Sequence, residues 1–246
     1  MIEHRDGLAW IETDGDGPEY FGLVFGQGVS PRELAVRLGA PEDSPVLDPA
    51  TIERIEQAWP THRYDEPNIG RIGDAGNGWS FCLLPCAAME TSGSGNPFGA
   101  DGSSPSKGIR TIEITDTGMD PANIIHMHDE TYVWSWFDGD SHDRAAEPDL
   151  LADRLRALGL PTIAPGTNLR DLDEETRDAR DRQYEIVYRA ISEHFGIGLP
   201  REEVTGRTLP GMVCEPREIR NARHAPEGPT ERNPTWDRLR ALGFDL

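Results

Sequence analysis

Two segments with β-strand character constrain the fold of this chain more than any other feature of its sequence. In GIRTIEIT, residues 108–115, alternate positions share a face, and one face carries Ile109, Thr111, Glu113 and Thr115. Residues 123–127 and 132–137 are rich in β-branched and aromatic side chains, and the four residues between them are polar. A short polar connection between two such runs predicts an antiparallel β-hairpin.

Helical signals on both sides of these strands predict a mixed fold. Ser30 is a good helix N-cap, with Pro31 at the first helical position and Glu33 in a capping-box arrangement. Gly39 closes this short helix. Amphipathic patterns predict further helices over residues 49–60, 147–159 and 171–197. A Gly-rich turn introduces a further predicted strand over residues 76–86. We therefore expect an α+β fold, with an antiparallel β-sheet and a few packed helices.

The chain is expected to form one α+β domain over residues 1–214, followed by a C-terminal arm over 215–246. Residues 91–108, TSGSGNPFGADGSSPSKG, have the composition of a flexible Gly/Ser/Pro loop at the surface. They lack the order of a phosphate-binding loop, since Lys107 is followed by glycine rather than by a hydroxyl residue. The arm ends in TWDRLRALGFDL, which fits either a small docked helix or a segment that binds a partner.

Acidic charge is the strongest global signal in the sequence. The 246 residues include 44 Asp and Glu against 24 Lys and Arg, a formal net charge of −20. Nucleic acids and anionic membrane surfaces both require basic patches, so this balance argues against either as a partner. It favours a basic protein partner, while solubility and a genome-wide preference for acidic residues are the alternative explanation.

The sequence also indicates a cellular location. No run approaches the roughly 18 apolar residues that a membrane span needs. The segment MIEHRDGLAWIE has charges where a signal peptide needs an apolar stretch. Cys82 and Cys86 lie in the apolar run WSFCLLPC, and with Cys214 they make an odd number that cannot all pair. We expect buried thiols in a cytoplasmic protein.

The hairpin raises the question of a metal site. His126 and His128 lie two apart in a predicted strand, so they should share a face, as two metal ligands often do. Six strand residues at roughly 3.3 Å each separate them by about 20 Å from a second group past the hairpin, which is Asp138, Asp140, His142 and Asp143. One ion cannot easily gather both groups, although the two histidines with an outside carboxylate would suffice for zinc. The alternative is a solvent-facing strand with polar side chains and no metal.

Sequence motifs of common enzymes are not found. There is no GxSxG elbow and no HExxH pair, and neither Cys82 nor Cys86 has a neighbouring histidine in the sequence. The carboxylates are so numerous that their presence alone identifies no catalytic pair. We therefore assign no catalytic residue and expect no cofactor.

The order of the elements is similar to that of a known family. The segments are LAWIE, GVSPRELAVRLGA, GWSFCLLPC, VWSWFDGD, EPDLLADRLRALGL and EHFGIGLPREEV. Over roughly residues 7 to 205 this order resembles an actinobacterial family of uncharacterised proteins, domain of unknown function 6461. The chain departs from that pattern in the 91–108 loop and after about residue 215. The resemblance implies an α+β domain without an assigned reaction, and its architecture is similar to that of immunity and interaction proteins.

Two functions are consistent with these observations. The first is a non-enzymatic, acidic protein-binding module that holds a basic partner, as an immunity or antitoxin-like protein would. The second is a metal-dependent hydrolase whose site is built on the 123–143 hairpin, with His126 and His128 as ligands. Retention of metal by the purified protein would distinguish the second from the first.

Overall fold

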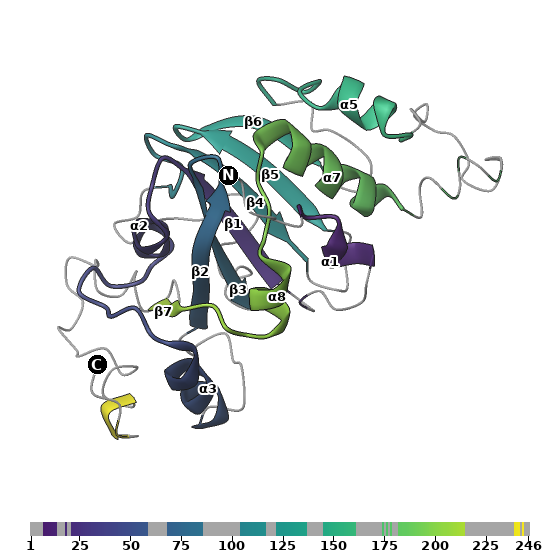
Figure 1. Ribbon diagram of the computed structural model, residues 1–246. Helices are drawn as coiled ribbons and strands as arrows, with labels where there is room; N and C mark the ends of the chain where they lie inside the picture. The colour runs from purple at the N-terminus through teal and green to yellow at the C-terminus, as the bar shows by residue number, and fades with distance from the viewer. Residues whose placement is uncertain are drawn as a thin grey trace.

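The computed structural model describes residues 7–13, 18, 21–58, 68–85, 104–116, 122–136, 145–160, 174, 176, 178, 182–214, 239–241 and 243. Over these residues the fold is α+β, as predicted, with a seven-stranded antiparallel sheet and helices on both of its faces (Figure 1). The sheet order is β6-β5-β4-β1-β3-β2-β7. The strands are β1 Phe21–Gln27, β2 Asn68–Gly76, β3 Trp79–Pro85, β4 Arg110–Thr115, β5 Asn123–His128, β6 Thr131–Trp136 and β7 Gly211–Cys214. The helices are α1 Trp10–Thr13, α2 Pro31–Arg37, α3 Pro49–Ala58, α5 Ala152–Ala157, α7 Gln183–Phe195 and α8 Arg201–Thr205.

The predicted hairpin is confirmed as β5 and β6. Its connection consists of Asp129 and Glu130, whose φ angles of 47° and 62° place both residues in the left-handed region. Two consecutive residues of this kind are typical of a type I′ turn, whose twist matches that of the two strands. The pairing shifts between His126 and Met127, which leaves Val133 of β6 as an extra residue.

One face of the sheet is apolar and is covered by α7. Phe25 of β1 and Trp79 of β3 are buried there together with Val187, Ile191 and Phe195 of the helix. The predicted apolar side of this helix is therefore confirmed. In Figure 1, α7 runs alongside β5 and β6, while α5 lies beyond it and α1 packs near its first turns.

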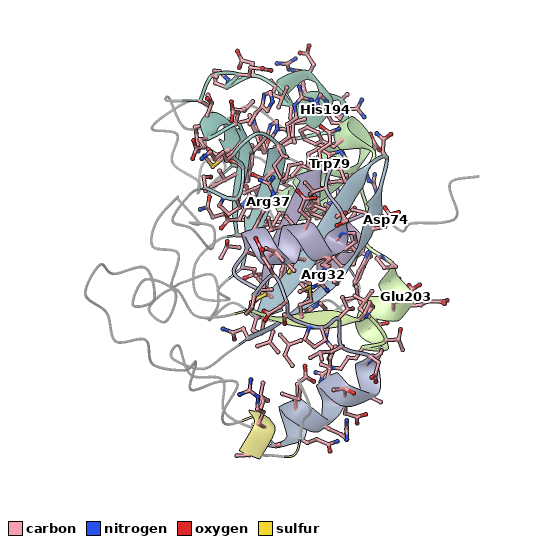
Figure 2. The ribbon with its side chains drawn as sticks, turned by 90° about the vertical axis from the view of Figure 1, so that its left-hand side faces the viewer. Arg32, Arg37, Asp74, Trp79, His194 and Glu203 are labelled. Atoms are coloured by element: carbon pink, nitrogen blue, oxygen red, sulfur yellow. The ribbon has the colours of Figure 1, made fainter. Side chains whose placement is uncertain are left out.

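The opposite face is covered in part by α2, which lies across the strands in Figure 2 and packs against β3, β2 and β7. The Ser30 hydroxyl accepts a hydrogen bond from the backbone N–H of Glu33 at 3.2 Å, which confirms the predicted N-cap. The Glu33 carboxylate accepts from Arg37 at 3.4 Å instead of reaching back to Ser30. The reciprocal half of the predicted capping box is thus replaced by an ion pair one turn along.

Two thiols meet on the α2 face. Cys82 of β3 and Cys214 of β7 are buried and not in a disulfide, and Gly70 of β2 lies between their strands. A methyl group at Gly70 would lie 2.7 Å from Cys82 Sγ and 3.2 Å from Cys214 Sγ, so only glycine leaves room for both sulfurs. The expected burial of Cys82 is confirmed, while Cys86 lies outside the described residues.

Three strands were not predicted from the sequence. β1 is buried on both faces along almost its whole length, so it shows no alternation of apolar and polar residues. β2 contains three glycines, which favour turns in a sequence prediction. β7 has only four residues. Each of the three takes its place through pairing with strands that are distant in the sequence.

Parts of the predicted loop and of the C-terminal arm are described. At the end of the expected flexible loop, residues 104–106 are buried, whereas Lys107 and Gly108 are exposed. Residues 91–103 lie outside the described residues. In the arm, Leu239 is fully buried and packs with Ile52 and Ile55 of α3. At this residue, at least, the arm is docked on the domain.

Among the described helices, none is long and apolar enough to cross a membrane.

Candidate functional site

His126, the first predicted metal ligand, is buried beneath α7. It lies on β5 next to Ile112 of β4, and its ring meets the Phe195 ring edge-on at 5.0 Å between centroids. Only 4% of the residue is exposed, and neither ring nitrogen has a hydrogen-bond partner among the described residues. Burial, with a smaller effect of Arg110 and the nearby histidines, lowers the pKa of His126 to about 4. The alternative of a wholly solvent-facing strand is therefore wrong at this residue.

His128 lies two residues further along β5 and is exposed. A third histidine, His194, lies at the same end of the sheet, near Trp79 in Figure 2, with its ring 4.6 Å from that of Phe195. Within the described part of the chain, no three His, Cys, Asp or Glu side chains are grouped so that they could hold a metal ion. The second predicted group, at 138–143, lies outside the described residues. The metal-dependent hydrolase therefore stays a prediction, and the contacts of the described residues give it no support.

Glu113 of β4 stands out on the opposite face of the sheet. It is directly opposite Val24 of β1 and Ile125 of β5, so its side chain shares the face that α2 covers elsewhere. Thr111 and Thr115, two residues to either side, share that face. The next strands add Asn123 opposite Thr115 and Ser135 opposite Ile125. These residues form a polar half-face, which consists of Thr111, Glu113, Thr115, Asn123 and Ser135.

The Glu113 carboxyl is an unusual group to bury. The residue is 9% exposed, and its only described hydrogen bond is a long one of 3.5 Å from the Thr115 hydroxyl. Burial raises the pKa of Glu113 to about 7, with a small opposing effect of that hydroxyl. Nearby, the side-chain oxygen of Asn123 is also buried without a hydrogen-bond partner among the described residues. The carboxyl can exchange a proton near neutral pH, and both groups can accept hydrogen bonds from a ligand.

One side of the polar half-face is bordered by residues 104–108, which are fastened to the hairpin turn. The Ser106 hydroxyl accepts from the Glu130 backbone N–H at 3.1 Å, and the Gly108 N–H donates to the Asp129 carboxylate at 2.8 Å. From α2, Arg37 donates to the Lys107 carbonyl at 2.8 Å. These bonds link α2, the 104–108 segment and the hairpin turn in the described structure.

Sequence reasoning placed Glu113 on the correct face but did not single it out as a functional residue. The signal was present in the alternation of β4, which puts two threonines and one glutamate on a single side. A strand with polar residues on one side usually faces water, so burial of that side could not be inferred. It depends on the pairing of β4 with β1, whose residues lie far back in the sequence.

Several arginines of the described residues are engaged within the chain. They donate to carboxylate or carbonyl oxygens of neighbouring residues, and they include Arg32, Arg37, Arg71, Arg154, Arg156 and Arg189. By contrast, Asp43, Glu202 and Glu203 are exposed and take part in no ion pair of the described residues. Figure 2 shows Glu203 extending outward from α8.

Comparison with known proteins adds no relative. No family model, no curated protein and no solved structure matches the chain. The resemblance to the actinobacterial family therefore stays a prediction from element order. The geometry of the polar half-face and the charge of the chain are the features that bear on its function.

Proposed function

We propose that the protein is a non-enzymatic binding module that holds a basic protein partner through its acidic surface. The observation that carries this proposal is the net charge of −20 together with exposed carboxylates that no described cation neutralises. Opposite charge on a partner accelerates encounter, because long-range attraction steers the two surfaces together. An immunity or antitoxin-like role, in which a harmful basic protein is neutralised, is the form of this function that we favour.

The location of the protein is part of the same proposal. The buried thiols of Cys82 and Cys214 are compatible with a reducing compartment, where disulfides are rare. We place the protein and its partner in the cytoplasm. The same charge balance disfavours nucleic acid and anionic membranes as partners, since both would be repelled.

Salt dependence tests the proposal. The full chain is immobilised and exposed to lysate of the cells that produce it, and retained proteins are eluted with increasing salt. We expect a protein of high isoelectric point, whose purified form associates at least about tenfold more slowly at high than at low ionic strength. The variant Glu202→Gln, Glu203→Gln should weaken this salt dependence. Thr208→Ala, which changes an exposed, uncharged residue just beyond the same helix, should not.

Two outcomes would contradict the proposal. One is a specific partner whose association rate does not change with salt. The other is one metal ion per purified chain that survives dialysis and is lost in the His126→Ala, His128→Ala double variant, which would favour the hydrolase instead.

A further inference from the structure

The polar half-face buries hydrogen-bonding groups that are incompletely satisfied by the described residues, namely two acceptors and the Ser135 hydroxyl. The Glu113 carboxyl receives only the 3.5 Å contact from Thr115, and the Asn123 side-chain oxygen receives none from the described residues. Buried acceptors of this kind are costly unless a donor reaches them. A group that satisfies both must therefore supply several N–H donors.

Within the described part of the chain, the neighbouring elements bring no cation to the Glu113 carboxyl. The facing residues of β1 and β5 are Val24 and Ile125, which are apolar. On α2, the charged residues Glu33 and Arg37 form an ion pair, and Arg37 also donates to the carbonyls of Pro105 and Lys107. The third charged residue of the helix, Arg32, donates to the Glu42 carbonyl. The hairpin turn contributes two carboxylates, Asp129 and Glu130, which accept from backbone N–H groups of 104–108. Lys107 is exposed and, in the described residues, no ion pair joins it to Glu113.

The spacing of the two acceptors suits a forked donor. Asn123 is opposite Thr115 and therefore diagonal to Glu113 across the β4–β5 pair. Diagonal neighbours in an antiparallel pair have Cα atoms about 7–8 Å apart, so their side chains can reach a common group. A guanidinium group carries five N–H donors in a rigid plane and binds two acceptors at once, whereas an ammonium group acts as a point charge.

We propose that Glu113, Thr115 and Asn123 form a receptor for one guanidinium group, such as the side chain of an arginine. The inference rests on the proposed function in one respect, because it makes this receptor the place where an arginine of the basic partner inserts. The guanidinium donates to the carboxylate of Glu113 and to the side-chain oxygen of Asn123. The Thr115 hydroxyl keeps its contact with the carboxylate.

Binding of the cation is coupled to loss of one proton. The guanidinium pairs with the ionised carboxylate, so below neutral pH the Glu113 carboxylic acid must first release its proton to solvent. With the pKa of Glu113 at about 7, roughly a tenth of the carboxyls are ionised at pH 6 and most are ionised at pH 8. Affinity for a guanidinium ligand is therefore expected to rise about tenfold between these two pH values.

The test uses the full chain and N-acetyl-L-arginine amide as the probe. Binding is followed at pH 6 and pH 8 by the backbone amide resonances of Thr115 and Asn123. We expect saturable shifts with an affinity about tenfold higher at pH 8, and loss of both binding and pH dependence in Glu113→Gln. Glu53→Gln removes the same charge from an exposed position on α3 and should bind as the parent does.

Additional variants and outcomes distinguish three cases, in which the receptor is wrong, the variant does not fold, or the proposed function is wrong. If Glu113→Gln does not fold, Asn123→Ala keeps the carboxyl and should still weaken binding by about tenfold. Absence of shifts at Thr115 and Asn123 in the parent, or equal binding by Glu113→Gln and the parent, overturns the receptor. A basic partner held equally by parent and Glu113→Gln overturns the receptor but keeps the proposed function. If the probe binds but no basic partner is found, the receptor is kept and the proposed function is overturned.

Discussion

His126 and Glu113 are titratable residues that are buried on opposite faces of the sheet, and their neighbours differ. His126 lies on the α7 face among aromatic and aliphatic side chains, with its ring against Phe195. Glu113 lies on the α2 face, beyond the helix itself, beside Thr111 and Thr115. Burial favours the neutral form of both groups, by lowering the pKa of His126 and by raising the pKa of Glu113. The imidazole is enclosed by a continuous apolar core. The carboxyl belongs to the polar half-face, where hydrogen-bond acceptors lack donors among the described residues.

This difference distinguishes a buried group that contributes to packing from one that can take part in recognition. A buried neutral histidine in an apolar core contributes shape and contact area, and its titration matters only when the protein is acidified. A buried carboxyl with a pKa near neutrality can change its charge under ordinary conditions and in response to a ligand. If the proposed binding is correct, the α7 face serves stability, whereas the polar half-face on the α2 side serves recognition.

The largest expected effect tests the apolar face. Trp79 is 2% exposed and meets the Phe195 ring edge-on at 5.7 Å between centroids. Trp79→Ala should lower the free energy of unfolding by about 3–5 kcal/mol, because it removes a large buried ring and leaves a cavity. Urea unfolding measures the loss. Val46→Ala, at a residue that is 45% exposed, should change stability by less than about 0.5 kcal/mol, and a loss equal to that of Trp79→Ala would contradict this view of the core.

Glu113 should make the protein less stable as the pH rises. Its pKa of about 7 in the folded state exceeds the ordinary value, so the folded protein binds the proton more tightly than the unfolded chain. The contribution is complete below about pH 4.5 and falls by about 3 kcal/mol as the pH rises through 7. In Glu113→Gln this loss should disappear from unfolding curves measured between pH 4.5 and 8. Glu203→Gln should retain it, and a parent-like profile in Glu113→Gln would refute the assignment.

His126 should act in the opposite direction. Its pKa of about 4 in the folded state lies below the ordinary value, so the unfolded chain binds the proton more tightly. Stability is therefore complete above about pH 6.5 and falls by about 3 kcal/mol as the pH drops through 4. His126→Leu should remove this acid sensitivity in the same unfolding series. His128→Leu, on the exposed end of β5, should keep it, and the opposite ranking of the two variants would show that the wrong histidine is buried.

The smallest expected effect concerns α2, the helix that covers only part of its face. Ser30→Ala removes the hydroxyl that accepts from the Glu33 N–H at 3.2 Å, and we expect a loss of about 1 kcal/mol. Thermal unfolding is sensitive enough to detect it. Thr208→Ala is the matched control, because it removes an exposed hydroxyl outside any helix, and equal losses in the two variants would argue against the cap.

Local patterns foretold the elements whose signals lie within a few residues. The N-cap at Ser30, the polar hairpin turn and the apolar stripe of α7 all depend on neighbours close in the sequence. The burial of Glu113 was not foreseen, because it depends on register with Val24. The burial of His126 was likewise missed, since Phe195 of a distant helix covers it. Both groups are buried by residues that are distant in the sequence, and local residue spacing does not reveal such contacts.

The arrangement around Gly70 has a consequence for how the protein responds to oxidants. Cys82 and Cys214 lie on the two strands that flank β2, opposite Ile72 and Asn68, so two strand spacings alone put their backbones at least about 9.5 Å apart. A disulfide usually requires Cα atoms less than about 7 Å apart. The intervening strand therefore acts as a spacer that holds the sulfurs near each other but keeps them from cross-linking. The sheet therefore prevents a disulfide between these two thiols, and both should stay reduced in mildly oxidising surroundings.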